Sequence, residues 1–306
     1  DSNTATSGTM SNQTYTAGTA LALTTNGFSK TGFTFAGWAT SSGGSVVYTN
    51  TQSLTLYETT TVYAKCTAGT YNVTFDSNTA ISGTMSAQSF TAGTPFSLTT
   101  NGFTKTGYNF TGWATTSGGS VVYTNGQSVT LNGATTLYAK WTATTFPVIF
   151  DSNTATSGSM SNQTYTAGSA LALTANGFNK TGFTFAGWAT SSGGSVVYSN
   201  TQLLTLYETT TVYAKWTAGT YAITFNINEG TSGTMSNQSL TAGTPLTLTA
   251  NTFGRTGYTF AGWATTSGGS VVYSDGQSVT LYGATTLYAK WTGITYRSEE
   301  HTSELQ

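Results

Sequence analysis

Side chains suited to acid–base chemistry are scarce in this chain of 306 residues. Enzymes move protons with His, Glu, Asp, Lys, Tyr or Cys side chains that are held together in a pocket. The sole His lies in the last ten residues, and only seven carboxylates remain outside them: Asp1, Glu58, Asp76, Asp151, Glu208, Glu229 and Asp275. Asp1, Asp76 and Asp151 occupy one and the same position in successive copies of a repeat, so we expect them to stabilise turns in separate copies. The sequence therefore predicts no catalytic residue and no enzyme activity.

Metal-ligand patterns are also missing from the sequence. A zinc site needs Cys and His at short spacings, and a calcium loop needs clustered oxygen anions. We considered a calcium ion only at residues 226–229 (Asn-Ile-Asn-Glu), and we favour an ordinary loop there. We predict no metal site and no cofactor.

Cys66 is the only cysteine, and the equivalent positions of the later copies hold Trp141, Trp216 and Trp291. One interpretation is a simple replacement of Trp at a half-buried position, which we favour. An intermolecular disulfide in an oxidising compartment is the alternative that remains open.

A lysine precedes this position in every copy, at Lys65, Lys140, Lys215 and Lys290. An intramolecular Lys–Asn crosslink would need a nearby acid in each copy, and the acids Glu58 and Glu208 are not repeated in the other two. We therefore favour solvated lysines that protect an edge strand from aggregation.

Composition excludes two classes of partner. Only 6% of the residues are charged, with 9 Lys and Arg against 10 Asp and Glu, which cannot supply the basic surface that nucleic acid requires. No run of apolar residues approaches the 18 or more that a membrane span needs. We predict no nucleic-acid binding and no membrane insertion of this region.

Four copies of a 75-residue unit make up most of the chain. Met10, Met85, Met160 and Met235 show this spacing, as do Trp38, Trp113, Trp188 and Trp263. We assign copy 1 to residues 1–68, copy 2 to 69–143, copy 3 to 144–218 and copy 4 to 219–293. The first copy begins without the strand that should precede Asp1, and the chain begins without Met, so we expect a fragment.

Alternating apolar residues predict strands in each copy. They include residues 71–75, 146–150 and 221–225, the segment 14–24 with a bulge at Gly18, and the segment 31–40. Pro147 should lie on an edge strand or among the first residues of its strand. Asn125-Gly126 and Asp275-Gly276 predict β-hairpins with a type I′ turn, which Asn50-Thr51 and Asn200-Thr201 fit less well.

The aromatic residues must form the core of so small a module. With 41 aromatic residues in the chain, burial of each large side chain stabilises the fold by about 1.5–3 kcal/mol. The expected core residues are Phe28, Phe33, Phe35, Trp38, Val47, Leu54, Leu56, Val62 and the closing Trp141 and its equivalents.

The segment TGYTFAGWATTSGGSVVYSDGQSVTLYGATTLYAKW (256–291) resembles the Listeria–Bacteroides repeat, also called the internalin B-repeat family. The motifs GFTFAGW (32–38), GYNFTGW (107–113), GFTFAGW (182–188) and GYTFAGW (257–263) extend the resemblance to all four copies. It implies a mainly β protein (β-rich α+β) of four tandem, small β-grasp-like modules in an elongated array. Cys66 and Asn226 depart from the pattern.

The resemblance also implies a function. Such modules serve as spacers or adhesive segments of bacterial secreted or cell-surface proteins, without catalysis. We therefore expect an extracellular, monomeric rod that contacts a surface protein or a glycan receptor. The alternative is a multivalent carbohydrate-binding protein in which exposed Trp38, Trp113, Trp188 and Trp263 stack on sugars. Trp residues in alternating strands of small modules favour the core instead.

The end of the chain differs from the rest. Residues 297–306 (RSEEHTSELQ) look like a translated sequencing adapter, so we exclude them from fold reasoning and expect residues 294–306 to form a disordered tail.

Overall fold

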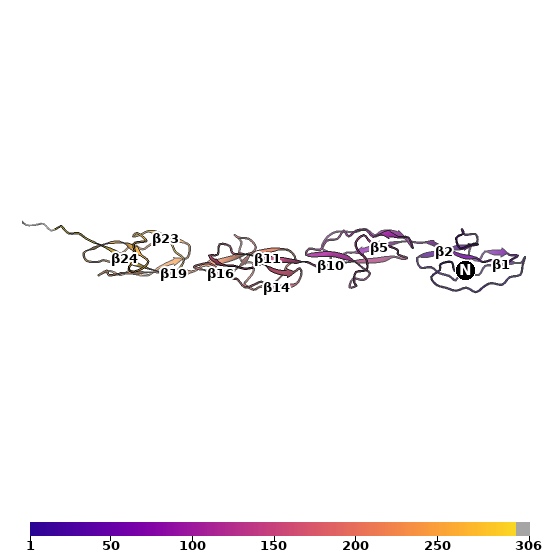
Figure 1. Ribbon diagram of the computed structural model, residues 1–306, viewed down its shortest axis with the longest axis horizontal. Helices are drawn as coiled ribbons and strands as arrows, with labels where there is room; N and C mark the ends of the chain where they lie inside the picture. The colour runs from indigo at the N-terminus through magenta and orange to yellow at the C-terminus, as the bar shows by residue number, and fades with distance from the viewer. Residues whose placement is uncertain (298–306) are drawn as a thin grey trace, which may run out of the picture. The chain divides into compact units, whose positions relative to one another are not determined.

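The computed structural model describes residues 1–297, and these residues form strands and loops without a helix (Figure 1). The expected mainly β class is confirmed. The expectation for the tail from residue 298 onward lies outside the described residues.

Copies 2, 3 and 4 each contain a four-stranded sheet. The closing strand lies between the first strand and the strand that carries the GYxFxGW motif. In order across each sheet, the strands are β6 (Gln88–Thr91), β5 (Thr70–Asp76), β10 (Thr135–Ala143) and β8 (Tyr108–Ala114) in copy 2; β13 (Gln163–Thr166), β11 (Thr145–Asp151), β18 (Thr210–Ala218) and β16 (Phe183–Ala189) in copy 3; and β20 (Gln238–Thr241), β19 (Thr220–Asn226), β24 (Thr285–Gly293) and β22 (Tyr258–Ala264) in copy 4.

The first and closing strands of a copy are parallel, whereas the other neighbours are antiparallel. In copy 2 the parallel register runs from Thr135 opposite Val73 to Tyr138 opposite Asp76. Parallel neighbours need a long connection between them, and here nearly the whole copy forms that connection.

The remaining strands are short. They pair as β1 (Ala20–Ala22) with β3 (Ser53–Thr55), β7 (Phe96–Ser97) with β9 (Ser128–Val129), β14 (Ala170–Ala172) with β17 (Leu203–Thr205), β21 (Pro245–Thr247) with β23 (Ser278–Thr280), and β12 (Ser157–Gly158) with β15 (Phe178–Asn179).

The predicted hairpin at Asn125-Gly126 is wrong, although a turn is present. The strand after the turn, β9, pairs with β7, while Tyr123 before the turn bridges to Trp113. Only Gly126 has a positive φ, 68°, so the turn is not type I′. The two flanking segments pair with different partners, and local sequence does not reveal this.

The predicted bulge at Gly18 is also misplaced. Gly18 lies in a turn, and the register shift occurs between Phe35 and Gly37 of β2 (Phe33–Ala39), opposite β4 (Tyr63–Ala68). Gly37 has a φ of 146°, and a Cβ there would lie 2.5 Å from Val46 Cγ1. Glycine is therefore required at this point of the motif.

Pro147 lies among the first residues of its strand, which is one of the two positions predicted from the sequence. It faces Thr164 of β13, and the parallel pairing with β18 begins one residue later, at Val148. β11 is nevertheless an inner strand of its sheet.

Each core is built around the motif tryptophan. In copy 2, Trp113 packs against Phe75, Phe103 and Phe110, with ring centroids 4.9 to 6.3 Å apart. Trp38 and Leu54 of the expected core are buried, and Phe28, Phe35, Leu56, Val62 and Trp141 are half-buried.

Two expected core residues lie elsewhere. Val47 is 52% exposed, so that prediction is wrong. Its backbone nitrogen donates to Trp38 O in the loop that passes the glycine bulge, and adjacent Val46 is exposed as well. Phe33 is half-buried and lies against Gly93 of copy 2, where an added Cβ would be 2.9 Å from the ring.

The chain divides into two compact units, residues 1–144 and 145–306, each holding two copies. Backbone hydrogen bonds join the two copies inside each unit. Gly69 N donates to Gly32 O in the first unit, and Gly219 N donates to Gly182 O in the second. These bonds, together with close contacts at glycine residues, restrict the movement of the two copies of a unit against each other.

Copy 1 has the same plan with two strands fewer among the described residues, since residues 13–16, the equivalents of β6, form no strand either. Among the described residues, no strand occupies the place that β5, β11 and β19 fill in the other copies. The corresponding sheet is reduced to β2 and β4.

Candidate functional site

The repeated aspartates hold turns, as predicted. Asp76 Oδ1 accepts a hydrogen bond of 2.7 Å from the backbone nitrogen of Asn78, and Asp151 accepts the same bond from Asn153. In copy 4 the amide oxygen of Asn226 takes this role at 2.9 Å. An uncharged amide serves equally well, so the position needs an oxygen acceptor and not a carboxylate that exchanges protons.

The asparagine two residues later is the centre of a polar cluster that recurs in every copy. Asn78 Nδ2 donates to Ser117 O at 3.0 Å and to Ala139 O at 2.9 Å. Asn78 and Thr79 both have a left-handed backbone, with φ of 44° and 76°. One amide thus joins the loop after the first strand to the closing strand and to the serine–glycine loop.

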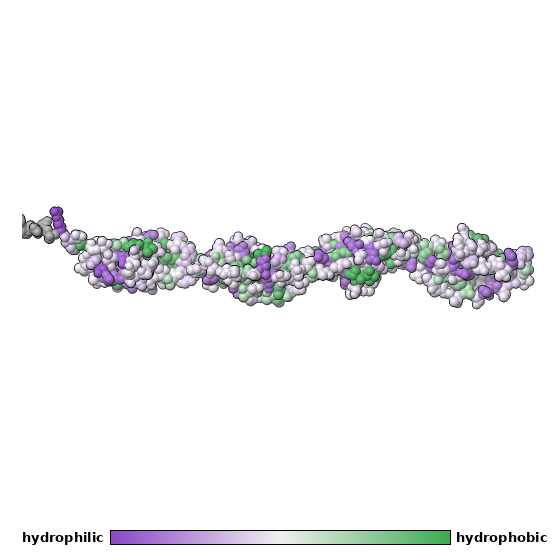
Figure 2. Space-filling view, viewed as in Figure 1, coloured by the Kyte–Doolittle hydropathy of each residue, from purple (hydrophilic) through white to green (hydrophobic). Residues whose placement is uncertain are grey.

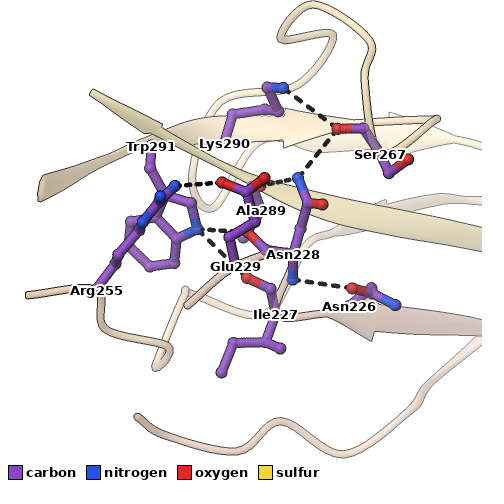
Figure 3. Close-up of polar contacts among 9 residues, drawn as sticks. All are labelled: Asn226, Ile227, Asn228, Glu229, Arg255, Ser267, Ala289, Lys290 and Trp291. Atoms are coloured by element: carbon purple, nitrogen blue, oxygen red, sulfur yellow. Dashed lines mark hydrogen bonds and ion pairs between the residues drawn. The ribbon is translucent and has the colours of Figure 1, made fainter. Parts of the chain in front are cut away.

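The lysine of the closing strand belongs to the same cluster. In copy 4, Lys290 Nζ lies 3.4 Å from Ser267 O, and Asn228 Nδ2 lies 3.1 Å from the same oxygen (Figure 3). Lys65, Lys140 and Lys215 make the equivalent contact. These lysines therefore satisfy a loop carbonyl and help to fix its position.

The closing tryptophan donates a hydrogen bond to the backbone of the loop that carries the asparagine. Trp141 Nε1 donates to Ser77 O at 3.1 Å, and Trp216 Nε1 to Ser152 O at 3.2 Å. In copy 4, Trp291 Nε1 lies 3.0 Å from Asn228 O (Figure 3). Cys66 replaces this indole in copy 1, where its thiol is free and half-buried.

Copy 4 adds an ion pair to the cluster. Arg255 Nη1 lies 2.7 Å from Glu229 Oε2, and the guanidinium also stacks over the Tyr258 ring at 3.9 Å. In copies 1 to 3 a lysine contacts a threonine hydroxyl at this place, as Lys105 does with Thr79. The Glu229 side chain is 70% exposed, and exposed ion pairs contribute little to stability. The ion pair of copy 4 therefore takes the place of the lysine–threonine contact of the other copies and has the same structural role.

The four motif tryptophans are interior residues. Trp38 is 2% exposed, and Trp113, Trp188 and Trp263 are 0% exposed. Stacking on a sugar needs an open indole face, and these rings have none. Their Nε1 atoms are buried without a hydrogen-bond partner, which costs roughly 1–3 kcal/mol each. Packing of the ring must outweigh that cost at every one of these positions.

The hydroxyl of Tyr165 is partly withdrawn from solvent and hydrogen-bonded to the backbone. Burial raises the pKa of Tyr165 above its usual value, and its hydroxyl donates to Glu208 O at 2.5 Å. A more weakly acidic phenol is a poorer proton donor. This tyrosine therefore ties β13 to the loop before β18.

No described residues form a metal site, since residues 1–297 contain no group of three or more His, Cys, Asp or Glu side chains that could hold an ion. Residues 226–229 instead form the turn and the ion pair described above. No described helix is long and apolar enough to cross a membrane.

Sequence reasoning missed the asparagine cluster, because the two acceptors of Asn78 Nδ2 lie 39 and 61 residues further along the chain. The available signal was the recurrence of Asn two residues after each repeated Asp or Asn, at Asn3, Asn78, Asn153 and Asn228.

Two comparisons with known proteins agree with the repeat. The model of the Listeria-Bacteroides repeat domain matches residues 2–65, 71–140, 146–215 and 221–290. A protein of Evansella cellulosilytica named "Putative Gly-rich membrane protein" is 28% identical over 277 residues, which cover 86% of this chain and 31% of that protein. The chain thus spans less than a third of the length of this relative.

Proposed function

The chain belongs to the Listeria-Bacteroides repeat family, and on that premise we propose that it is a non-catalytic spacer or stalk of a bacterial secreted or cell-surface protein. Its task is to hold other parts of the protein away from the surface. Contact with a surface protein or a glycan receptor is a further role that repetition would strengthen through avidity.

The observation that carries the proposal is how the repeated residues are used. The motif tryptophans, the Asp and Asn turn residues and the asparagine clusters all serve the packing or hydrogen bonding of their own copy. Because its recurring residues stabilise each copy from within, the chain is suited to bear mechanical force and to separate other parts of the protein.

Two further features support a spacer. Backbone hydrogen bonds at Gly69 and Gly219 join successive copies within each unit, which limits bending there. Most of the surface in view has intermediate hydropathy, with small separate apolar patches (Figure 2). Only 6% of the residues are charged. Such a surface resists nonspecific electrostatic association.

The name of the Evansella protein supports attachment to a bacterial envelope. We propose an extracellular location for the present chain on this ground. An antibody against it should label intact cells of the bacterium that produces it, and treatment of those cells with protease should remove the label. Labelling that appears only after lysis would contradict the location.

Small-angle X-ray scattering tests the spacer itself. From the usual size of domains, four copies in line should extend about 120 Å. A maximum dimension near that value supports a stalk, whereas one of about 60 Å, as expected for a single compact body of this length, rules it out. A glycan array is the companion test, since retention of a glycan by the folded chain would favour the carbohydrate-binding alternative.

A further inference from the structure

Five Asn-Gly dipeptides occur in the chain, beginning at residues 26, 101, 125, 132 and 176. In such a pair the backbone nitrogen of the glycine is able to attack the side-chain carbonyl of the asparagine, because glycine has no Cβ to hinder the approach. The reaction needs a side chain that can turn toward this nitrogen and a nitrogen that is not held in another hydrogen bond. Hydrogen bonding therefore distinguishes five chemically identical pairs.

Three of these asparagines are held through both atoms of the side-chain amide. Asn101 Oδ1 accepts a hydrogen bond of 3.0 Å from Phe103 N, and Asn101 Nδ2 donates to Phe103 O at 2.9 Å. Asn26 and Asn176 make the same two bonds. In copies 1 and 3 the nitrogen of the following glycine also donates to a methionine sulfur. These three pairs are therefore locked against the reaction.

The pair Asn132-Gly133 has none of these restraints. Among residues 1–297, the Asn132 side chain makes no hydrogen bond, and Gly133 N donates none. Asn132 is exposed, and no atom lies within 4 Å of a Cβ placed on Gly133. Asn125 is the intermediate case, because its Oδ1 accepts a bond of 2.8 Å from Asn101 N. Of the five asparagines, only Asn132 is thus free to turn toward its neighbour.

Asn132 also lies where copy 2 meets copy 1. A Cβ on Gly32 would lie 2.1 Å from Asn132 O and 2.8 Å from Asn132 C, so this main-chain carbonyl packs directly against copy 1. Gly32 O accepts the hydrogen bond from Gly69 N that joins the two copies. In the second unit Tyr282 O approaches Gly182 equally closely. Tyr282 has no side-chain amide, so that joint lacks the reactive group.

We propose that Asn132 is a site of slow, spontaneous modification by water that loosens the contact between copies 1 and 2. Gly133 N attacks Asn132 Cγ, and the new N–C bond closes a succinimide ring. The Cγ–Nδ2 bond breaks, and the side-chain nitrogen leaves as ammonia with the proton of the backbone amide. Water then opens the ring. Attack of water at Cγ gives aspartate, whereas attack at the main-chain carbonyl gives isoaspartate, in which the chain continues through Cγ.

Isoaspartate changes the joint in two ways. The carbonyl that lay against Gly32 becomes a free carboxylate, and the main chain before Gly133 gains one carbon atom. A carboxylate pressed against copy 1 is poorly solvated and is repelled by the Gly32 carbonyl oxygen. The lengthened loop also no longer fits the close approach to Gly32. The hydrogen bond from Gly69 N to Gly32 O should therefore weaken.

Incubation of the full chain in mildly alkaline water enriched in heavy oxygen tests the reaction. Base removes the proton of the attacking amide, and every ring opening takes up one oxygen atom from the solvent. Peptide mapping by mass spectrometry gives the rate at each of the five asparagines. We expect Asn132 to react at least about tenfold faster than Asn101, where two side-chain hydrogen bonds must break first. Asn125 should lie between them, and a rate at Asn101 or Asn125 that equals the rate at Asn132 overturns the proposal.

The free peptide LNGATT, the sequence of residues 131–136, gives the rate of the same pair without the fold. Asn132 in the full chain should react within about tenfold of this peptide, because no hydrogen bond of its side chain has to break. A greater slowing in the full chain would show that the fold protects Asn132, and it would overturn the proposal.

Hydrogen exchange on the converted chain tests the effect on the joint. The amide of Gly69 should lose protection, whereas the amide of Gly219, which makes the equivalent bond to Gly182 O, should keep it. Asn132→Gln is the matched control, since it keeps the amide but would have to close a larger ring, which is much slower. After the same incubation it should take up no label at residue 132 and should keep the protection of Gly69. Unchanged protection of Gly69 in the converted chain, or an equal loss in the Asn132→Gln chain, overturns the proposal.

Discussion

The asparagine after each first strand connects three segments through one amide group. In copy 3, Asn153 Nδ2 donates to Ser192 O at 3.0 Å and to Ala214 O at 2.9 Å, while its backbone has a φ of 47°. Asparagine tolerates this left-handed conformation better than most residues. The side chain and the backbone geometry both favour this residue type at this position.

Asn153→Ala should destabilise copy 3 by about 2–4 kcal/mol, because two hydrogen bonds are lost and a left-handed alanine is strained. Asp151→Asn is the matched control. It should change stability by less than about 0.5 kcal/mol, since Asn226 already accepts the same bond in copy 4. Hydrogen exchange of amides in copy 3 measures both. Equal effects of the two substitutions would contradict the role given to Asn153.

The turn residue at 51, 126, 201 and 276 differs between copies but keeps one backbone conformation. Thr51 and Thr201 have φ of 65° and 60°, and Gly126 and Gly276 have φ of 68° and 64°. A β-branched residue is strained in this region, whereas glycine is not. Thr51 and Thr201 therefore keep the same turn conformation as the glycines, but at the cost of backbone strain. This agrees with the poorer fit that the sequence predicted for Thr.

Thr201→Gly should stabilise copy 3 by about 0.5–1 kcal/mol, the strain relieved less the added entropy of an unfolded glycine. Gly276→Thr in copy 4 should have the opposite sign and a similar size. Local unfolding free energies from hydrogen exchange in copies 3 and 4 provide the comparison. The explanation fails if both substitutions destabilise.

At the residue scale, sequence identified the buried motif tryptophans and the turn role of the repeated aspartates. Both follow from local pattern and composition. It placed Val47 in the core as one of the large apolar residues, yet Val46 and Val47 lie in a loop that follows the bulge and are exposed.

At the element scale, the bulge at the glycine of the motif shapes each sheet. In copy 3 the register shifts between Phe185 and Gly187, and Gly187 has a φ of 141°. A Cβ on Gly187 would lie 2.6 Å from Val196 Cγ1 and 2.8 Å from Tyr198 O. The absence of a side chain at the bulge therefore lets the loop of residues 196–198 pack directly against the strand.

Gly187→Ala should destabilise copy 3 by about 2–3 kcal/mol, since strain and overpacking both act there. Gly193→Ala is the control, because no atom lies within 4 Å of its added Cβ, and its effect should stay within about 0.5 kcal/mol. Urea unfolding followed by exchange of copy 3 amides gives the measurement. A tolerated Gly187→Ala would mean that the strand can lose its bulge.

Sequence located the first strand and the motif strand from their period of two. It did not yield their pairing, because the first and closing strands of copy 2 meet in parallel although they lie at opposite ends of the copy. The turn at Asn125-Gly126 suggested a hairpin between the two flanking segments. Long-range pairing prevents it, because the strand after the turn, β9, pairs with β7. The likeness to a β-grasp module stays a prediction.

At the scale of the molecule, successive copies within a unit are coupled through glycine. Gly182 has a φ of 80°, and a Cβ on it would lie 2.1 Å from Tyr282 O and 2.9 Å from Ala242 Cβ of copy 4. Gly257, its equivalent in copy 4, has a φ of 76° and open space around it. The two glycines share the same backbone requirement and differ only in the neighbouring copy.

Gly182→Ala should therefore cost at least about 2 kcal/mol more than Gly257→Ala, because only the first substitution places a methyl group against another copy. Exchange of amides in copies 3 and 4 should show that both lose protection in the Gly182 variant. Equal costs would mean that the contact between the two copies contributes nothing to stability.

The fourfold repeat was accessible from sequence, because near-identical segments reveal their own spacing. The coupling at Gly182 was not, since Gly257 has a closely similar local sequence without the contact. The difference arises only from the presence of copy 4 beside Gly182.

The parallel pairing of first and closing strands has a mechanical consequence. Because β5 and β10 run in the same direction, the chain enters copy 2 at one end of this pair and leaves it at the other. A pulling force along the chain slides these strands past each other and loads all their hydrogen bonds together, instead of peeling them open one at a time.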